Sequence, residues 1–355
     1  MTHITTALVG CGFFGQQLAQ GFTKANSQLI GVTDIDKHRA QQLAEKFNTQ
    51  AYTDIHQLLK HTTPDLLLIA TPNYAHQDPA MIALNHNCHL FIETPFVIDP
   101  KQGQQIINLA QQKQKQIFVG HLLRTLPGLL KAKQIITQNQ LGKITVARAN
   151  RQRWIDSSTN KHWWKNDIKL TGGKLFNEIH ELDLLCWLLG DVHSVYAQAT
   201  NIAHLDTPEN HDIIQLLLRF NNGIFASLEM GTAYRLHEWG IAIHGELGAL
   251  VVNFFTSTMT LTLSNGHRQQ FNLFDEFEAD LSLRESSKNI QRYHEKDTLA
   301  PLWLSRAVEI EAENIINHLL GKQHSVLTNN IMFAVSAANA ASLSIKQQKL
   351  ILLSN

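Results

Sequence analysis

The sequence predicts an α/β protein in which a doubly wound parallel sheet is followed by a second domain of α+β type. Up to about residue 121, short apolar segments alternate with helical segments of roughly 10–15 residues, which is typical of βαβ units. Beyond that point, strand-like segments with hairpin signals dominate. A chain of 355 residues also exceeds what one ordinary core holds. We therefore expect one domain at 1–122 and another at 123–355.

The expected strands of the first domain are short and apolar. The segment DLLLIAT at 65–71 is an uninterrupted apolar run, as expected where helices cover both faces of a parallel sheet. Asn48 and Asn87 each follow a helical segment, and asparagine tolerates the left-handed conformation that ends many helices. The five strands are expected at 4–10, 28–34, 65–71, 88–94 and 116–121.

The second domain reads as a largely antiparallel sheet with a few helices. Asn222-Gly223 and Asn265-Gly266 are strong signals for two-residue hairpin turns. A continuous helix is expected over 174–189, and the polar stretch 275–298 is expected to be a loop or an arm that contacts a partner. Further helices are expected at 128–140, 301–320 and 328–345, with a final strand in the tail KLILLS.

Composition and charge narrow the class of function. Lysine plus arginine and aspartate plus glutamate number 30 each, which argues against a nucleic-acid partner. No apolar run approaches the ~18 residues that span a bilayer, and no signal peptide is evident, so we expect a cytoplasmic protein without a membrane partner. The three cysteines share no ligand spacing, so no metal is expected.

A dinucleotide motif follows the first strand. Gly10, Gly12 and Gly15 form a G-x-G-x-x-G turn between a strand and a helix. The first glycine permits the tight turn, the second lets the backbone approach a pyrophosphate, and the third lets helix and strand pack closely. Asp34 ends the second strand, where a carboxylate accepts hydrogen bonds from the adenosine ribose. The pattern predicts a Rossmann domain that binds NAD.

The choice between NAD and NADP is left open by the residues near Asp34. Its negative charge disfavours the 2′-phosphate of NADP. Lys37 and Arg39 follow closely, however, and basic side chains can hold that phosphate.

The segment ATPNYAH follows the third long strand, at the edge of the sheet where open α/β sheets bind ligands. Thr71, Pro72, Asn73 and His76 are therefore candidates to line the cofactor. The alternative is an ordinary strand-to-helix turn, for which the T-P-N sequence is also suited.

Six segments occur together in the order of one known family. These are GCGFFG, Asp34, ATPNYAH, IETP, VGHLLRTLP and GGKLFNEIHELDLLCWLLG. In them the chain resembles the Gfo/Idh/MocA family, which includes glucose–fructose oxidoreductase and inositol dehydrogenase. The resemblance implies an N-terminal Rossmann domain and a C-terminal domain with a large, open, mostly antiparallel sheet. It also implies use of NAD or NADP on sugars, cyclitols or related alcohols, and a homodimer or homotetramer formed through the C-terminal sheet.

The resemblance assigns roles by position. His180 matches the histidine that faces the reacting carbon, and Glu93 and Thr94 lie on the loop beneath the nicotinamide. Arg124 and Pro127 match the segment that crosses between domains, and Arg124 is a candidate substrate contact. The residues implied to hold the cofactor are Gly10, Gly12, Phe13, Phe14, Gly15, Asp34, Thr71, Pro72, Asn73, His76 and Glu93.

Two departures from the family pattern bear on catalysis. The usual E-K-P reads Glu93-Thr94-Pro95, so the lysine is replaced by a threonine that is neither a cation nor a base near neutral pH. The residue four before the family histidine is often aspartate, but here that position is Phe176. A shift of one residue places Asn177 there instead.

Alcohol oxidation needs a base, and His180 has a suitable ordinary pKa. Asn177 and Asp183, three residues before and after it, are candidates to orient its ring or contact substrate. Glu178 and Glu181 are alternative acids or bases, although a solvated helix face is their ordinary role. Lys174 is an alternative source of the lost lysine, with exposure to solvent as its ordinary role.

Aromatic and basic side chains precede this helix. Trp154, Trp163 and Trp164 are candidates to stack on a sugar ring, with an interdomain core as the alternative. We count Trp164 as a candidate substrate contact. Arg151 and Arg153 alternate along a strand and are weak candidates for holding an anionic group.

Three functions compete at this stage. The first is an NAD(P)-dependent oxidoreductase that acts on a sugar, cyclitol or related secondary alcohol, with His180 as acid and base. The second is a redox glycosidase or lyase that keeps its NAD tightly bound, as in relatives that lack the usual lysine. The third is a non-catalytic sensor or regulatory subunit that binds a dinucleotide.

Overall fold

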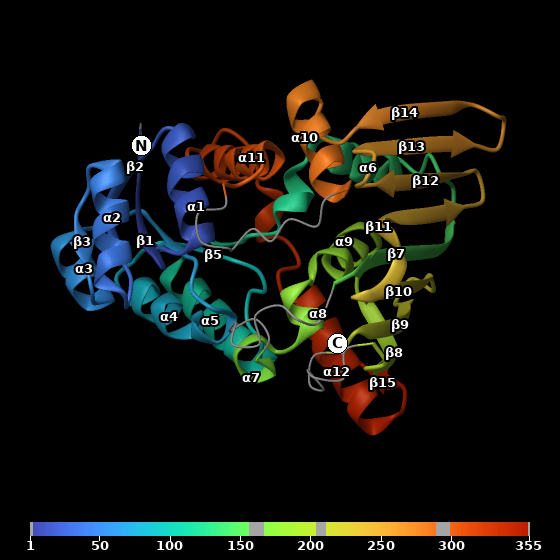
Figure 1. Cartoon of the computed structure of the whole chain (residues 1–355), viewed down its shortest axis with the longest axis horizontal. Helices are drawn as coiled ribbons and strands as arrows, with labels where there is room; N and C mark the ends of the chain where they lie inside the picture. The colour runs from blue at the N-terminus through green and yellow to red at the C-terminus, as the bar shows by residue number, and fades with distance from the viewer. Residues whose placement is uncertain (1–2, 156–166, 204–210, 289–298, 354–355) are drawn as a thin grey trace. The chain divides into compact units, whose positions relative to one another are not determined.

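The computed structural model describes residues 3–155, 167–203, 211–288 and 299–353, which form two compact units (Figure 1). The first unit contains the chain up to Thr125 and the described part of Arg292–Ile331. The second contains the described remainder from Leu126 onward. Each unit has its own sheet: the sheet of the first unit is parallel, and that of the second is mostly antiparallel.

The first unit contains a parallel sheet whose six described strands follow the order β3-β2-β1-β4-β5-β6. The chain enters at β1, extends to one side through β2 and β3, and returns to continue on the other side. The predicted doubly wound sheet is confirmed. The direction reverses between β1 and β4, and open sheets bind ligands at the carboxyl ends of strands beside such a reversal. The strands are β1 Ile4–Val9, β2 Ser27–Thr33, β3 Ala51–Tyr52, β4 Leu66–Ile69, β5 His89–Ile92 and β6 Ile117–Val119.

Helices lie on both faces of this sheet, with α1 and α11 on one side and α4 and α5 on the other (Figure 1). β4 and most of β5 are buried, as expected for a central parallel strand covered twice. The predicted left-handed helix ends at Asn48 and Asn87 are present, with φ of 49° and 60°. The helices are α1 Phe13–Lys24, α2 Lys37–Phe47, α3 Ile55–His61, η1 Asn73–Ala75, α4 Gln77–Asn85, α5 Pro100–Lys113, η2 Leu122–Thr125, α11 Leu302–Leu319 and η4 Val326–Thr328.

The first unit differs from the expected first domain in one segment, because α11 and η4 belong to it. Helix α11 packs against α1 at Gly21, where an added Cβ would lie 2.8 Å from the Val308 side chain. Lys24 of α1 also pairs with Glu309 of α11. We expected α11 and η4 in the second domain because they lie far along the sequence. The apolar face of α11 instead completes the hydrophobic core of the first unit.

The second unit contains a sheet whose nine described strands follow the order β14-β13-β12-β11-β7-β10-β9-β8-β15. Neighbours are antiparallel except β7 and β10, which are parallel. Asn222-Gly223 and Asn265-Gly266 form the predicted turns, with Gly223 and Gly266 at φ of +88° and +87°. The strands are β7 Ile144–Trp154, β8 Val192–Thr200, β9 Ile213–Phe220, β10 Phe225–Gly231, β11 Ala233–Gly245, β12 Gly248–Asn253, β13 Thr258–Leu263, β14 Arg268–Asn272 and β15 Ile351–Leu352.

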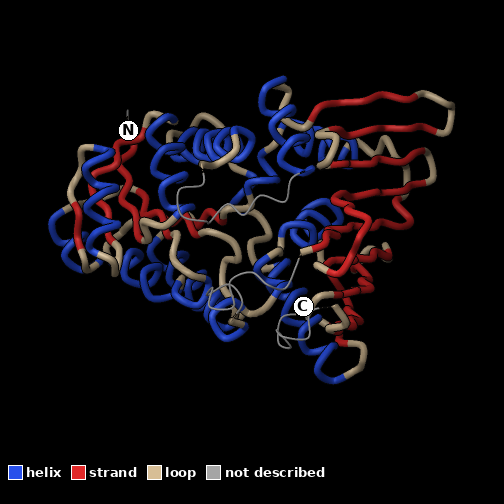
Figure 2. Tube along the Cα trace, viewed as in Figure 1, coloured by secondary structure: helices blue, strands red, loops and turns tan. Residues whose placement is uncertain are grey.

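The helices of the second unit pack on its sheet, α9 against β7 and β10, and α12 against β8 (Figure 2). In β9, residues alternate between buried and exposed, so one face of the sheet carries the core. Leu217 and Phe225, on neighbouring strands, are more than half exposed. The helices are α6 Pro127–Thr137, α7 Ile168–Thr171, α8 Lys174–Asn177, α9 His180–Leu189, α10 Phe277–Lys288 and α12 Phe333–Gln347.

Two local predictions in this unit were wrong. The stretch expected as a loop from residue 275 contains helix α10, which is anchored by the buried carboxylate of Asp280 accepting from the Phe274 backbone N–H and the Ser257 hydroxyl. The helix expected over 174–189 is interrupted, because Glu178 adopts φ −120° and ψ 44°. Its apolar periodicity continues across the break, so the pattern did not reveal it. The remainder of 275–298, from residue 289, lies outside the described residues.

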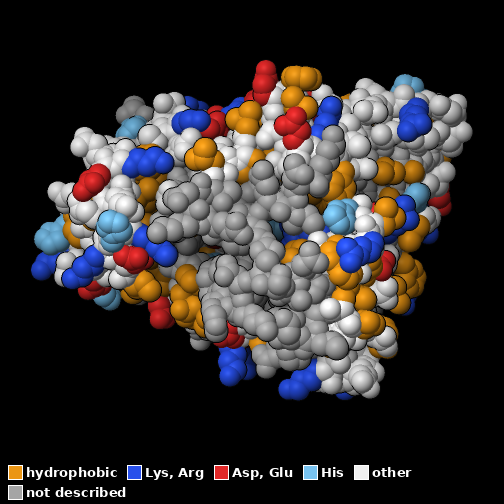
Figure 3. Space-filling model, viewed as in Figure 1, with side chains coloured by type: hydrophobic (Ala, Val, Ile, Leu, Met, Phe, Trp, Pro, Cys, Tyr) orange, Lys and Arg blue, Asp and Glu red, His pale blue; other side chains and the backbone are white. Residues whose placement is uncertain are grey.

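Charge is evenly mixed over the visible surface. Figure 3 shows basic and acidic side chains interspersed on the described part of the face that it presents. The formal net charge of the whole chain is +0. No helix among the described residues is both long and apolar enough to cross a bilayer.

Ser344→Ala should destabilise the second unit. The fully buried Ser344 hydroxyl donates to the Lys349 carbonyl at 2.6 Å and accepts the Ala197 N–H at 2.9 Å, joining α12 to β8. Leaving these groups unpaired should cost about 1–2 kcal/mol, seen as a lower melting temperature. Ser342→Ala is the control, because among the described residues the Ser342 hydroxyl donates only to the Ala338 carbonyl of its own helix. Equal effects of the two changes would contradict this assignment.

Candidate active site

The glycine turn after β1 is fixed by close backbone contacts. Gly10 has φ of +95°, and a Cβ there would lie 2.6 Å from the Ala70 carbonyl oxygen. A Cβ on Gly15 would lie 1.9 Å from the Gly10 carbonyl oxygen. At Gly12 an added Cβ meets nothing within 4 Å. The outer glycines are therefore needed for packing, whereas Gly12 borders open space that a ligand can approach.

Helix α1 begins at this turn with an N-terminus suited to an anion. Gly12 is its N-cap and supplies no side-chain cap, and the first turn contains no acidic residue. The N–H groups and positive dipole end of such a helix favour phosphate. Phe13 and Phe14 open the helix with their rings edge to face, 5.3 Å apart.

Asp34 lies immediately after β2 and joins the second strand to the glycine turn. One carboxylate oxygen accepts the Cys11 N–H at 2.7 Å, and the other accepts the Asp36 N–H at 2.8 Å. Each oxygen retains a lone pair for a further donor such as a ribose hydroxyl. Arg39 is directed to Asp36, with Nε and carboxylate oxygen 3.4 Å apart. Together, the open Gly12, the uncapped helix and the anchored carboxylate fit a dinucleotide.

Sequence reasoning missed Ile35. Its side chain is 99% exposed, directly after Asp34. An isoleucine this exposed offers apolar surface beside the carboxylate. The signal was present in the sequence as an apolar residue after the strand ends, but nothing local indicated that the chain would leave it uncovered.

His76 has a different position from the one expected. It is 1% exposed, with Nδ1 3.0 Å from the Pro95 carbonyl and Nε2 3.0 Å from the Thr71 carbonyl. Burial lowers the pKa of His76, while hydrogen bonds to these carbonyl groups oppose the shift. The ring thus holds the loop after β4 against the loop after β5 and fixes the backbone of both.

The rest of these two loops is compact. The Thr71 hydroxyl donates to the Ala75 carbonyl at 3.1 Å, and Asn73 is buried. The Thr94 N–H donates to the Glu93 carboxylate at 3.1 Å, and the Thr94–Pro95 peptide bond is cis. Pro72 and Thr94 are half-buried. The structure therefore brings the predicted residues 71–76 and 93–95 together at one edge of the parallel sheet.

A second carboxyl group lies close to Glu93. Glu311 of α11 is 1% exposed, and among the described residues its Oε1 has no hydrogen-bond partner. Burial, and then the negative charge of Glu93, raise the pKa of Glu311 well above its ordinary value. Both causes favour the neutral form of the Glu311 carboxyl group. Sequence reasoning missed it because 218 positions separate it from Glu93.

Arg124 is not available as a substrate contact in this structure. Its side chain is fully buried in the first unit, where Nη1 donates to the Asn329 carbonyl at 2.7 Å and approaches the Val326 carbonyl at 3.4 Å. It ties η2 to η4. A long charged side chain next to a family motif suggested an exposed role, but the returning segment at 326–329 covers it.

In the second unit, His180 is the first residue of α9, and its side chain is half-buried. Asn177 ends α8, so the break at Glu178 places it on a different helix from His180. Asp183 is 2% exposed and lies within the first turn of α9, where an acidic side chain stabilises the helix N-terminus. The expectation that one continuous helix carries Asn177 and His180 is therefore wrong, whereas Asp183 lies on the same helix as His180, three residues after it, as expected.

Charged residues of α9 and the α8–α9 break pair with arginines of β7. Glu178 lies 2.6 Å from Nη2 of Arg153 and 3.0 Å from Nε of Arg151. Glu181 is fully buried and accepts from Arg151 Nη1 at 2.9 Å and from Trp239 Nε1 at 2.6 Å. These carboxylates are not a solvated helix face. They neutralise the arginines, which are not left to hold a free anion.

The two carboxyl groups have opposite pKa shifts. Burial raises the pKa of Glu178, but the nearby Arg153 and Arg151 outweigh it and lower the value to about 2. Burial also raises the pKa of Glu181, and here Arg151 and the Trp239 N–H only partly offset it. Glu178 is therefore ionised throughout the neutral range.

Lys174 is buried rather than solvated. It is 7% exposed, and its Nζ donates to the Thr232 hydroxyl at 3.0 Å. Burial lowers its pKa to about 8, with Glu178 and Asp212 acting in the opposite direction and Arg153 reinforcing the shift. Exposure to solvent, which the sequence suggested as the ordinary role of Lys174, is thus excluded.

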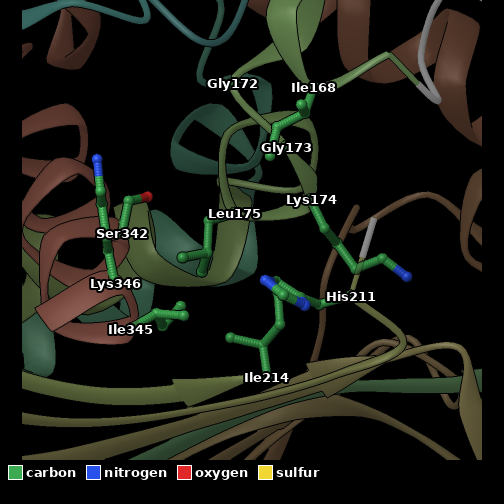
Figure 4. A pocket seen from close by; sticks show the side chains of 10 residues that line it. All are labelled: Ile168, Gly172, Gly173, Lys174, Leu175, His211, Ile214, Ser342, Ile345 and Lys346. Carbon is green, nitrogen blue, oxygen red and sulfur yellow. The ribbon is translucent and has the colours of Figure 1, made fainter. Parts of the chain in front are cut away.

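A pocket of roughly 300 Å³ lies beside Lys174 in the second unit (Figure 4). Leu175, Ile214 and Ile345 supply its apolar lining. Figure 4 shows the Lys174 side chain running along the edge of this group, with its ammonium directed away from the three apolar side chains. Lys174 therefore lines the pocket, while its ammonium points away from the apolar lining.

The tryptophan candidates divide into two groups. Trp163 and Trp164 lie outside the described residues. Trp154 ends β7, where the Arg235 guanidinium lies 3.6 Å from the centroid of its ring. The His237 ring accepts the Trp154 backbone N–H at 3.1 Å. Within the described ranges, no group of three or more His, Cys, Asp and Glu side chains is arranged to hold a metal.

Family models match most of the chain. A model described as an oxidoreductase family with an NAD-binding Rossmann fold matches residues 4–121, and a GFO/IDH/MocA C-terminal domain matches residues 129–251. The fold and the dinucleotide turn described above agree with both. The chain therefore belongs to the Gfo/Idh/MocA family of NAD-binding oxidoreductases.

Curated relatives cover nearly the whole chain at modest identity. An uncharacterized oxidoreductase of Streptococcus pneumoniae is 27% identical over 86% of this chain and 84% of its own length. Two proteins named 2,7-anhydro-N-acetylneuraminate hydratase are each 25% identical to the present chain. The one from Mediterraneibacter gnavus matches 91% of this chain and 88% of its own length, and the one from Escherichia coli matches 98% and 96%.

Solved structures share the fold over the full length. An NAD binding oxidoreductase from Klebsiella pneumoniae has a TM-score of 0.84 at 20% identity, covering 100% of both chains. Levoglucosan dehydrogenase in complex with NADH and levoglucosan has a TM-score of 0.82 at 16% identity, covering 99% of this chain and 100% of that one. At these identities the likeness supports the fold and nothing finer.

Gly12→Ala and Gly15→Ala should have opposite consequences. Gly12 has φ −70° and ψ −166°, which alanine accepts, and its Cβ enters only the open space expected for the pyrophosphate. This change should preserve the melting temperature and weaken NAD binding by roughly tenfold or more. Gly15→Ala collides with the Gly10 carbonyl and should cost about 2 kcal/mol or more. Calorimetric NAD titration and thermal melts separate the two; unchanged NAD affinity in Gly12→Ala would contradict the placement.

Glu311→Gln should remove a pH dependence of stability. The folded-state pKa of Glu311 is raised, so its contribution is fully present below the unfolded pKa near 4.3 and is lost as pH rises through the folded value. The wild type should lose stability relative to Glu311→Gln as the pH rises above about 4.3. Glu313→Gln, on the same helix but half exposed, is the control and should show no such trend. Parallel melting curves for wild type and Glu311→Gln across this range would refute the assignment.

Proposed function

We propose that this protein oxidises or reduces a secondary alcohol of a sugar, cyclitol or related carbohydrate, with NAD as the hydride carrier. The observation that carries this proposal is the Asp34 carboxylate bound to the glycine turn beside an uncapped helix N-terminus. NAD held at this site would supply the acceptor for a hydride from the carbon of the alcohol. When that carbon loses hydride, the hydroxyl proton must leave as well, so that a carbonyl group forms.

His180 is our choice for the group that takes this proton. It holds the family position, lies at the start of α9, and interacts electrostatically with Glu178. A histidine has an ordinary pKa near 6.5, which suits proton exchange at neutral pH. Thr94 can donate or accept one hydrogen bond near the nicotinamide but cannot replace the base.

A second function is supported by two observations together. The chain has Thr94 where the family usually has lysine, and two relatives are named hydratases. Addition of water involves no net oxidation, so an NAD-dependent hydratase must return to substrate the hydride that it removes. The alternative proposal is such a redox-neutral reaction, with NAD retained through the cycle. The third possibility, a non-catalytic sensor, is weakened by the buried charged groups that surround Glu178.

Two further proposals concern the state of the protein. The buried thiols of Cys11 and Cys88, which form no disulfide bond, support a reducing, cytoplasmic location. The exposed apolar side chains Leu217 and Phe225 on the sheet of the second unit support a homodimer or homotetramer formed through that sheet.

Turnover should distinguish the two enzymatic functions and depend on His180. We would incubate the protein and NAD with 2,7-anhydro-N-acetylneuraminate, levoglucosan and myo-inositol, following reduced nicotinamide by absorbance and products by mass spectrometry. Net reduced nicotinamide with loss of two hydrogens from one compound indicates a dehydrogenase. Gain of water without reduced nicotinamide indicates the redox-neutral reaction.

His180→Gln should lower kcat by about 10²–10⁴ in either case. His193→Gln, an exposed histidine of β8, is the control and should retain activity. Full activity of His180→Gln would end the assignment of its role. NAD binding without any turnover across this and a wider carbohydrate panel would favour the sensor.

A further inference from the structure

The pocket of roughly 300 Å³ in the second unit is lined by residues of α7, α8, α12 and β9 and of the loops that precede α8 and β9 (Figure 4). Gly172 and Gly173 join α7 to α8 with φ of +77° and +89°, which side chains rarely adopt. This turn brings Ile168 back against the loop, because a Cβ on Gly173 would lie 3.3 Å from Ile168 Cγ1. The glycine turn and Ile168 therefore form one wall of the pocket.

The opposite side of the pocket is apolar. Leu175 of α8 and Ile214 of β9 are buried, and Ile345 of α12 is half-buried. A cavity of about 150 Å³ with a lining of this kind holds one benzene ring. A volume of roughly 300 Å³ therefore has room for a single ring with a short substituent.

The charged residues of the pocket have one sign. Among the described residues that line it, two are lysines and none is acidic. The Lys174 ammonium donates to the Thr232 hydroxyl and points away from the apolar side chains. Lys346 is exposed, and Figure 4 shows it beside Ser342 on the α12 side of the pocket. Lysine carries a positive charge at neutral pH and has three N–H groups to donate, so Lys346 favours an anion at this edge.

His211 adds a further polar group to the lining. Its side chain is half-buried, and among the described residues its Nδ1 has no hydrogen-bond partner. Burial lowers the pKa of His211, with Asp212 opposing the shift and Lys174 reinforcing it, so the neutral ring is favoured. A neutral imidazole has one N–H and one acceptor nitrogen. With Nδ1 unpaired, a ligand in the pocket can determine which nitrogen carries the proton.

We propose that this pocket binds a small monocarboxylate whose body is one apolar ring. The ring lies against Leu175, Ile214 and Ile345, and the carboxylate faces Lys346 and the His211 N–H. A free sugar or cyclitol does not suit the pocket, since several of its hydroxyl groups would face apolar side chains and lose their hydrogen bonds. The inference therefore goes beyond the proposed function and concerns a ligand other than the carbohydrate.

The first experiment locates the ligand with sodium benzoate as the probe. In the whole chain with ¹³C-labelled isoleucine methyl groups, Ile214→Val and Ile345→Val identify the two signals of interest. We expect benzoate at roughly 20 mM, above the millimolar dissociation constant usual for a ligand of this size, to shift both signals. The signal of Ile4, on β1 of the first unit, should not move. Unshifted Ile214 and Ile345 signals, or equal shifts with myo-inositol, would overturn the proposal.

The second experiment separates the charge from the apolar ring. Benzyl alcohol has nearly the size of benzoate but no charge. Lys346→Gln should weaken benzoate binding about two- to fivefold, the range of an exposed ion pair, and leave benzyl alcohol binding unchanged. Lys349→Gln, at another exposed lysine just after α12, is the matched control and should change neither. Unchanged benzoate binding in Lys346→Gln, or equal weakening of both ligands, would refute the anionic class of ligand.

The third experiment fills the pocket. Ile345→Trp adds an indole from a half-buried position and should abolish the benzoate shift of the Ile214 signal, while calorimetry still detects NAD binding. Leu343→Trp places the same side chain at an exposed position of α12 and should retain benzoate binding. Benzoate binding that survives in Ile345→Trp would refute the location. A thermal melt checks that Ile345→Trp is folded, and Lys346→Gln tests the site independently of it.

Discussion

The contact between Gly15 and the Gly10 carbonyl is the constraint on which the first unit depends. With no side chain at Gly15, α1 starts directly against the end of β1. A second glycine, Gly21, then lets α11 pack closely on α1. Helix α11 carries Glu311, which is buried in the electrostatic range of Glu93. The position of the loop after β5 is thus linked, through helices α11 and α1, to the glycine turn after β1.

Charge compensation has the corresponding role in the second unit. Arg151 and Arg153 of β7 are paired with Glu178 and Glu181, and the Trp239 N–H adds a donor to Glu181. Removing ions from water costs several kcal/mol each unless their partners are well placed. The group therefore fixes how α8 and α9 meet the sheet. It also leaves little freedom for any single charge to change without affecting the others.

Sequence patterns predicted those features whose residues lie close together in the chain. The strand, glycine turn, helix and Asp34 occur within 31 residues, and the Asn-Gly hairpins within two each. The missed features join distant segments. Arg124 is covered by residues 326–329, Glu311 meets the charge of Glu93, and Lys174 reaches Thr232. No periodicity within either partner indicates such a pairing, and so burial of these charged side chains was not predictable.

Among the described strands of the second sheet, β7 and β10 form the single parallel pair, and this pair affects how the unit can fold. β7 and β10 are neighbours, but the chain between them includes α8, α9, β8 and β9. Parallel pairing requires that whole crossover to close before the two strands meet, and contacts of such long sequence separation form slowly. Arg151 and Arg153 lie on β7, and Glu178 and Glu181 lie within the crossover. The cluster of opposite charges is therefore assembled within the same slow loop closure, and its attractions favour the crossover that brings β10 to β7.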